Sequence, residues 1–247
     1  MHAALTSSHP LVFAHRGGSK IGPENTITAF DRGLAAGADG LELDVHLSRD
    51  AVVVVHHDRL LDRTTRATGP IADRTAAELA DVDVPTLRDV LARYPRTRII
   101  IELKESSVAL AAAVVSEVQR AGASEQVCLG SFSVAVLKAA RAAAPGLATS
   151  AGRFEVRMAL YRSWLNLSPG RVRYHAFQVP ETSGRTRVVS PRFVKLAHRA
   201  GLVVQVWTVD EPDDIRRLLD WGVDGIISDR PDVAAEVVRD WSMVNGR

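Results

Sequence analysis

The sequence predicts an α/β fold in which eight parallel strands close into a barrel and helices pack around it, a (β/α)8 barrel. Three observations favour this fold class. Short apolar runs alternate with segments of helical apolar spacing along the chain, an order typical of parallel α/β folds. The 247 residues, 46% of them hydrophobic, can bury one large core, and such barrels commonly fill a single domain of this length. No linker-like segment interrupts the alternation, which indicates one domain over residues 1–247.

The first strand and helix set the pattern for the rest of the chain. Residues 11–14 form an apolar strand, and the spacing of Ile27, Phe30 and Leu34 predicts a helix over residues 25–36 that Gly37 ends. The other predicted strands are residues 41–47, 52–55, 99–103, 127–131, 147–151, 176–179, 202–208 and 225–228. The other predicted helices are residues 75–80, 85–94, 107–121, 133–143, 154–165, 190–200, 211–220 and 231–241.

The segment LELDVHLSRDAVVVVHHD, residues 41–58, combines a strand with two unlike faces and a returning arm. Apolar residues alternate with Glu42, Asp44 and His46, so the two carboxylates point the same way. A parallel crossover needs about a dozen residues or more, and the connection here is far shorter, so residues 52–55 should return antiparallel. Removing this arm from the strand candidates leaves eight for the barrel. The alternative, an open doubly wound sheet, usually carries a glycine-rich fingerprint that GGSKIGPEN does not match.

Charge and cysteine content exclude several classes of partner. The formal net charge is +2, and basic and acidic residues are interspersed, so we expect no nucleic-acid partner. The single Cys128 lies in the apolar run QVCLG and is expected to be a buried small hydrophobe. No apolar run approaches membrane-spanning length, and the N-terminus lacks the pattern of a signal peptide. We therefore expect a cytoplasmic protein without stable membrane insertion.

Three acidic residues are expected to converge inside the barrel. Glu102 follows an apolar strand and shares the alternating phase of Glu42 and Asp44 on the neighbouring strand, so all three should face the interior. Converging carboxylates repel one another unless they are protonated or neutralised, and a hard divalent cation is the simplest solution. The set predicts one Mg²⁺ or Ca²⁺ ion. The alternative is a structural ion-pair network with Arg16 and Lys104.

Two histidines are expected at the end of the barrel where active sites of this fold lie. His15 ends the first strand, and His57 ends the returning arm of the hairpin. Because the ordinary pKa of histidine lies near neutrality, the pair suits general acid–base catalysis. His46 and His56 are left out of the site, because His46 lies beyond Asp44 and His56 has the opposite phase from His57.

Fixed positive charge and two further positions complete the predicted site. Arg16 and Lys104, together with a cation, could hold a phosphate whose charge grows in the transition state, which implies a phosphoryl substrate. Gln178 and Trp207 end later strands and are candidates for the pocket wall, although spacing alone favours a packing role for Trp207. An insertion of about residues 58–85, polar and threonine-rich, could cover the site.

These residues lie in motifs that resemble the glycerophosphodiester phosphodiesterase family. The motifs, in the order of that family, are AHRGG at 14–18, PENT at 23–26, LELDV at 41–45, VVHHDRLLDRTT at 54–65, PTL at 85–87, IELK at 101–104, VWTVD at 206–210 and GIISDRPD at 225–232. The set is highly specific, although single motifs within it are weak. The resemblance implies a TIM barrel that uses a divalent metal to hydrolyse glycerophosphodiesters to sn-glycerol 3-phosphate and an alcohol.

The resemblance also assigns roles by matching motif. It implies acid–base catalysis by His15 and His57, metal binding by Glu42, Asp44 and Glu102, phosphate contact by Arg16 and Lys104, and support of the first loop by Glu24. In the mechanism that it implies, the glycerol hydroxyl of the substrate attacks phosphorus, and water opens the resulting cyclic phosphate. One histidine takes a proton while the other gives one.

One departure from the family pattern bears on the substrate. Only ADVDV lies between Leu79 and Pro85, where the family usually carries a longer insertion, so the substrate size is not fixed. Two other functions are considered. A lysophospholipase D acting on lysophospholipids would need an apolar groove near the pocket. A catalytically silent barrel that binds phosphodiesters or a protein partner predicts the loss of a catalytic or metal residue, and none is lost.

Overall fold

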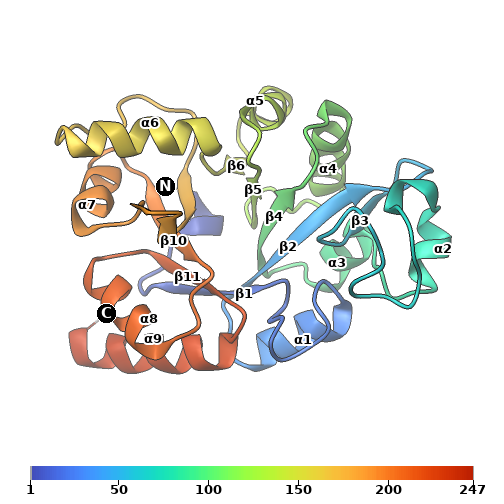
Figure 1. Cartoon of the computed structure of the whole chain (residues 1–247), viewed down its shortest axis with the longest axis horizontal. Helices are drawn as coiled ribbons and strands as arrows, with labels where there is room; N and C mark the ends of the chain where they lie inside the picture. Colours follow the sequence, from blue (N-terminus) through green and yellow to red (C-terminus); the bar gives the residue numbers. More distant parts are fainter. Residues whose placement is uncertain (1, 247) are drawn as a thin grey trace.

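The structure, a computed structural model, describes residues 2–246, and in it eight parallel strands line a barrel (Figure 1). Their order around the sheet is β6-β5-β4-β2-β1-β11-β10-β7. The strands are β1 (Leu11–His15), β2 (Gly40–Leu47), β4 (Arg98–Leu103), β5 (Val127–Gly130), β6 (Ala148–Thr149), β7 (Ala176–Pro180), β10 (Val203–Trp207) and β11 (Gly225–Ser228). A single bridge between Ser150 and Ala176 joins the two ends of the sheet. The predicted barrel is confirmed, with β6 shorter than its predicted range.

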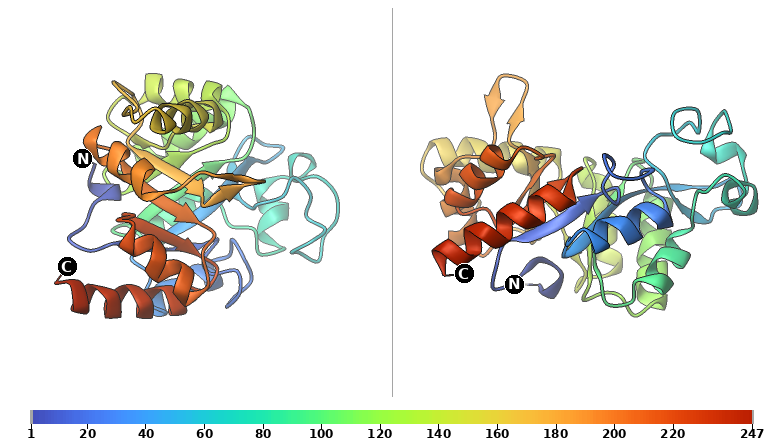
Figure 2. Two further views of the ribbon diagram at one scale, coloured as in Figure 1. Left: turned by 60° about the vertical axis from the view of Figure 1, so that its left-hand side comes forward. Right: turned by 90° about the horizontal axis from the view of Figure 1, so that it is seen from below.

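Helices surround this barrel, as both views of Figure 2 show. They are α1 (Ile27–Ala35), α3 (Leu87–Arg93), α4 (Val108–Arg120), α5 (Val134–Ala143), α6 (Arg153–Trp164), α7 (Pro191–Arg199), α8 (Pro212–Asp220) and α9 (Pro231–Asn245). Side-chain caps explain several of their starts, because Thr26, Ser107 and Ser190 each accept a bond from a backbone N–H of the first turn. Within residues 2–246, no helix is long and apolar enough to cross a membrane.

Alternate residues of each barrel strand point outward, toward the helices, or inward, into the barrel. Leu41, Leu43 and Ile101 point outward and are fully buried with residues of α3 and α4. The interior is closed at the N-terminal end by the short helix η1 (Ala3–Leu5), where Leu5 packs against Cys128. Cys128 is buried, as predicted, and burial raises the pKa of its thiol to about 12.

The returning arm and the insertion form a separate unit beside the barrel. Strand β3 (Val53–Val55) pairs antiparallel with β2, with Val45 opposite Val55. The segment that follows contains η2 (Ile71–Asp73) and α2 (Ala76–Ala80), and it buries a small core of its own. That core comprises Val54, Leu61, Ile71, Leu79 and Val84. Figures 1 and 2 show the unit projecting from one side of the barrel, so it flanks the site instead of covering it.

A hairpin that the sequence did not predict follows β7. Strands β8 (Thr182–Ser183) and β9 (Thr186–Arg187) pair antiparallel, and all four residues are exposed. Two-residue polar strands give no alternating apolar signal, so periodicity could not detect them. Figure 2 shows the hairpin standing out from the barrel beyond the end of β7.

Close approach of α1 to the first loop makes Gly33 a sensitive position. A Cβ atom at Gly33 would lie 2.6 Å from the backbone oxygen of Gly17. Alanine normally stabilises a helix relative to glycine, but here the clash should outweigh that preference. We therefore expect Gly33→Ala to lower the free energy of unfolding by about 1–3 kcal/mol. Urea denaturation measures the loss. Gly146→Ala is the control, because its Cβ would meet nothing within 4 Å; equal stability of the two variants would contradict the expectation.

Candidate active site

Three carboxylates converge at the C-terminal end of the barrel. Glu42 and Asp44 extend from the same face of β2, and Glu102 lies directly opposite Asp44 in the parallel register with β4. One carboxylate oxygen from each of the three lies within 4.8 Å of the others. Glu42 and Asp44 are only 5% and 1% exposed. The group could hold one metal ion, because hard divalent cations prefer clustered oxygen ligands.

The electrostatics of the cluster fit a cation. Burial and the charge of Asp44 together raise the pKa of Glu42 to about 7. Burial also raises the pKa of Glu102, whose Oε1 is buried and has no hydrogen-bond partner among the described residues. A buried carboxylate oxygen without a partner is costly. A bound cation would satisfy it and reduce the repulsion, so the donor set suits a hard divalent ion.

Asp44 is held as a carboxylate by three neighbours. Burial alone would raise its pKa, but Lys104 and Arg16 outweigh burial, so the pKa of Asp44 is lowered. The Lys104 Nζ lies 2.9 Å from Oδ1, and the Arg16 Nε lies 3.3 Å from Oδ2. Asn25 Nδ2 donates to Oδ2 at 2.9 Å, and Asn25 Oδ1 accepts from the Asp44 backbone N–H. Sequence reasoning missed Asn25, although the PENT motif contains it.

His15 is the last residue of β1 and lines the central cavity. Its Nδ1 lies 2.6 Å from Asp229 Oδ1, and its Nε2 lies 3.8 Å from Glu42 Oε2. Burial lowers the pKa of His15, but Glu42 and Asp229 raise it by more, so the net shift is upward. Asp229 follows β11 (Gly225–Ser228), and sequence reasoning gave it no role. Its carboxylate orients the imidazole and leaves Nε2 directed at the acidic cluster.

His57 reaches the same cavity from the end of the β3 arm. Its Nδ1 lies 2.6 Å from Asp58 Oδ1. Burial lowers the pKa of His57, and the nearby carboxylates only partly offset this, so the net shift is downward. The two histidines left out of the predicted site support its backbone: His46 Nε2 donates to the His57 carbonyl at 3.0 Å, and His56 lies 2.9 Å from the Asp58 carbonyl.

Behind these residues, Arg63 links the two halves of the site. Its guanidinium donates to Glu24 at 2.6 and 2.9 Å and to Asp58 Oδ2 at 2.6 Å. Glu24 in turn accepts from Arg16 at 3.1 Å. Glu24 is not among the described residues that line the cavity, so its contact is with Arg16 and not with the cavity itself. Sequence reasoning missed Arg63, because an arginine in a polar insertion gives no signal of its partners.

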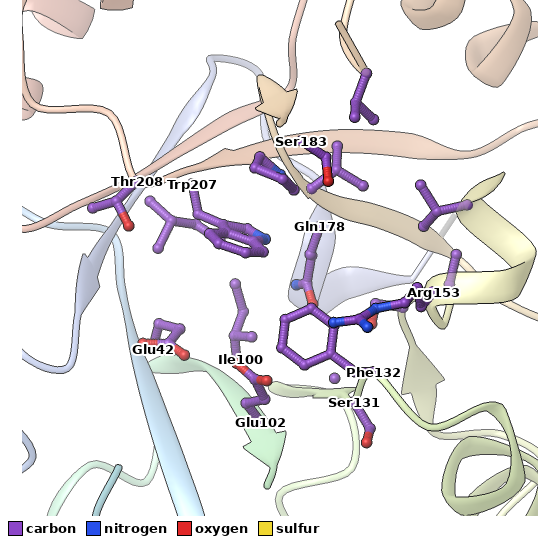
Figure 3. Close-up of a pocket in the computed structure, with 18 of the residues that line it drawn as sticks. Glu42, Ile100, Glu102, Ser131, Phe132, Arg153, Gln178, Ser183, Trp207 and Thr208 are labelled. Carbon is purple, nitrogen blue, oxygen red and sulfur yellow. The ribbon is translucent and has the colours of Figure 1, made fainter. Parts of the chain in front are cut away.

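The cavity above the acidic cluster has a volume of about 720 Å³. His15, Arg16, Glu42, His57 and Lys104 lie at its inner end together with Glu102. Gln178 and Trp207 form part of its wall, as predicted for Gln178, while Trp207 also packs against the barrel interior. Figure 3 shows these two side chains above the carboxylates, with Phe132 and Arg153 farther along the cavity.

The part of the wall that sequence reasoning missed comes from outside the strands. Phe132 follows β5, and Arg153, Arg157, Tyr161 and Trp164 belong to α6. We call these five residues the outer arm of the cavity. Several of them are exposed, including Phe132 at 48% and Trp164 at 55%. The pattern of polar residues at strand ends does not identify them. In sequence, a helix whose side chains face a cavity resembles any other surface helix.

Comparison with known proteins agrees with this geometry. Residues 15–233 match the glycerophosphoryl diester phosphodiesterase family. The chain belongs to this family. This membership confirms the resemblance seen in the motifs and the enzyme class, glycerophosphodiester phosphodiesterase, that the resemblance implied. The matched span contains every residue of the site described above, from His15 to Asp229.

Relatives resemble this chain over nearly its whole length and theirs. A glycerophosphodiester phosphodiesterase of Caldanaerobacter subterraneus is 32% identical, with 93% of this chain and 98% of the relative covered. One from Bacillus altitudinis is 31% identical, with coverage of 92% and 97%. The crystal structure of a glycerophosphodiester phosphodiesterase from Agrobacterium tumefaciens is 29% identical with a TM-score of 0.78, and 92% of this chain and 98% of that chain are covered.

Proposed function

We propose that the protein hydrolyses glycerophosphodiesters to sn-glycerol 3-phosphate and an alcohol, using one divalent cation and two histidines. The observation that carries the proposal is the shared cavity. It is lined by His15, His57, Glu42 and Glu102. One carboxylate oxygen from each of Glu42, Asp44 and Glu102 lies within 4.8 Å of the other two. Family membership supports the substrate class.

Glu42, Asp44 and Glu102 would hold the cation. When bound, a Mg²⁺ or Ca²⁺ ion supplies Lewis-acid stabilisation of phosphoryl charge and orients the phosphate. Arg16 and Lys104 add fixed positive charge beside it, since both line the cavity. Their ion pairs with Asp44 do not exclude this role, because each cation has further donors that can face a phosphate oxygen.

Two carboxylate–imidazole pairs are suited to move protons. Asp229 and Asp58 each lie 2.6 Å from the Nδ1 atom of a histidine, His15 and His57 respectively. A carboxylate at Nδ1 fixes the tautomer and leaves Nε2 for the reacting group. One imidazole accepts the proton of the attacking glycerol hydroxyl, and the other donates a proton to the departing alcohol. The two then exchange roles when water opens the cyclic phosphate.

The direct test is release of sn-glycerol 3-phosphate. Purified protein stripped with EDTA is incubated with glycerophosphoglycerol, with and without added Mg²⁺ or Ca²⁺. We expect release only when the cation is present, and we expect EDTA to abolish it reversibly. Release at full rate in excess EDTA would contradict the metal requirement. No release from any glycerophosphodiester with either cation would contradict the substrate class.

A second candidate substrate is a lysophospholipid. The outer arm carries aromatic and apolar side chains, among them Tyr161 and Trp164, within the same cavity, and an acyl chain needs such a surface. A lysophospholipase D would release choline and lysophosphatidic acid from lysophosphatidylcholine. Choline release, measured with lysophosphatidylcholine and with glycerophosphocholine under the same conditions, separates the two, because a preference for the lipid over the acyl-free diester would favour the second candidate.

Arg63 is expected to act as a positioning residue. It contacts the partners of both Arg16 and His57 but does not line the cavity among the described residues. Since outer partners of metal and catalytic groups typically contribute about 10- to 100-fold to activity, we expect Arg63→Ala to lower kcat/KM about tenfold, with partial rescue in Arg63→Lys. Steady-state kinetics provide the measurement. Arg66→Ala, in the same insertion and bonded to the Asp81 carbonyl, should retain full activity.

A further inference from the structure

The outer arm differs in charge from the inner end of the cavity. Among the described residues that line the cavity, the carboxylates are Glu42 and Glu102, and both belong to the metal cluster. The charged residues of the outer arm are Arg153 and Arg157. A ligand group that enters the arm therefore meets positive charge and aromatic surface, and it finds no acidic side chain.

Arg153 is held in place by the aromatic wall. Its guanidinium carbon lies 5.0 Å from the centre of the Phe132 ring, a cation–π distance. Phe132 in turn packs edge-on against Trp207, with 6.2 Å between ring centres. Figure 3 shows the guanidinium across the Phe132 ring and facing the cavity. Unlike Arg141, which pairs with Glu155 at 2.7 Å, Arg153 makes no ion pair in the described part of the chain, so its N–H groups are available to a ligand.

An aromatic wall can also receive a quaternary ammonium group, because several rings together bind such cations. In this arm, however, the guanidinium of Arg153 already lies over the Phe132 ring. The guanidinium carbon of Arg157 lies 5.5 Å from the centre of the Phe154 ring, and both residues belong to α6. Arg157 adds a second positive charge. A cationic group that enters the arm would therefore be repelled by two guanidinium groups.

We propose that the outer arm is the subsite for the leaving alcohol and that it selects alcohols carrying a phosphate or carboxylate over alcohols carrying a quaternary ammonium group. The proposal rests on the proposed function. A phosphodiester centred on the acidic cluster has two substituents, and the glycerol must keep its hydroxyl against the phosphorus. The second substituent, which varies between substrates, is then the one that extends toward Arg153.

The test compares four diesters of glycerol phosphate. The leaving alcohol is cationic in glycerophosphocholine and neutral in glycerophosphoglycerol. It is anionic in the terminal phosphate ester of glycerophosphoglycerol. In glycerophosphomethanol it is methanol, which is small and neutral. Because a hydrogen bond to a charged group contributes about 1.5–3 kcal/mol, kcat/KM should be at least about tenfold higher for the anionic diester than for glycerophosphocholine. Arg153→Glu should abolish or reverse this ratio.

Controls separate the possible failures. Glutamate is compatible with the first turn of a helix, and an unchanged melting temperature together with cleavage of at least one of the four diesters reports that Arg153→Glu is folded and active. Arg192→Glu, an exposed charge reversal at the start of α7 and outside the described cavity lining, should leave the ratio unaltered. Equal or better cleavage of glycerophosphocholine by the wild type, or an unchanged ratio in Arg153→Glu, would overturn the subsite. Failure of all four diesters would overturn the proposed function as well.

Discussion

Replacing His57 with alanine is expected to lower kcat about 10²- to 10⁴-fold, the usual contribution of a positioned acid–base group. His57 and His15 are the imidazoles among the described cavity-lining residues, and the proposed mechanism uses one of them for each proton transfer. KM should change little, because the missing interaction forms only in the transition state. Asp58 keeps its bond to Arg63, so the backbone around the deleted side chain should be retained.

The measurement is steady-state release of sn-glycerol 3-phosphate at saturating cation. His9→Ala is the matched control. His9 precedes β1, which begins at Leu11, and therefore lies at the end of the barrel opposite the site. Its side chain pairs with Asp39 at 3.4 Å. A His57→Ala enzyme with the kcat of the wild type and of His9→Ala would remove His57 from the mechanism.

The barrel and the acidic cluster could be predicted because both depend on local pattern. Alternation along β2 fixes the face to which Glu42 and Asp44 belong, and a one-residue error would have exposed Leu41 and Leu43 to the interior instead. The connection after Leu47 is too short for a parallel crossover, and β3 indeed pairs antiparallel with β2. The face to which a strand residue belongs and the reversal of the chain both depend on a few consecutive residues. Both can therefore be predicted directly from the sequence.

The partners of the site residues could not be predicted in the same way. Asp229 contacts His15 from a position 214 residues away, and Arg63 contacts Glu24 across 39 residues. Such pairs depend on how strands and loops meet in space, and no sequence period encodes them. The outer arm was missed for a related reason: Tyr161 and Trp164 line the cavity from α6, and which side of a surface helix faces a cavity depends on how the helix packs against the barrel.

Addition of Mg²⁺ or Ca²⁺ to the EDTA-treated protein is expected to raise its melting temperature. A ligand that binds only the folded state adds about 2.7 kcal/mol at 100 times its Kd, which corresponds to about 5–10 °C for a chain of this length. Scanning calorimetry measures the shift without reference to activity. Glu42→Gln should lose most of it, because a neutral amide replaces one of the three clustered carboxylates. Glu125→Gln, an exposed site after α4, should show the full shift.

The pH dependence of this shift gives the sharper test of the cluster. Without a cation, burial and the charge of Asp44 raise the pKa of Glu42 to about 7, above the ordinary value of the unfolded chain. Between these two pKa values the folded state binds more protons than the unfolded state, so stability in EDTA should fall as the pH rises through about 7. The cation binds the deprotonated carboxylate and reverses this loss, so its stabilising effect should be larger at alkaline than at acidic pH. In Glu42→Gln the titrating proton is gone, and the stability in EDTA should vary less with pH. A wild-type protein whose stability in EDTA rises across the same interval would show that the three carboxylates are already neutralised within the protein, as in a structural ion-pair network.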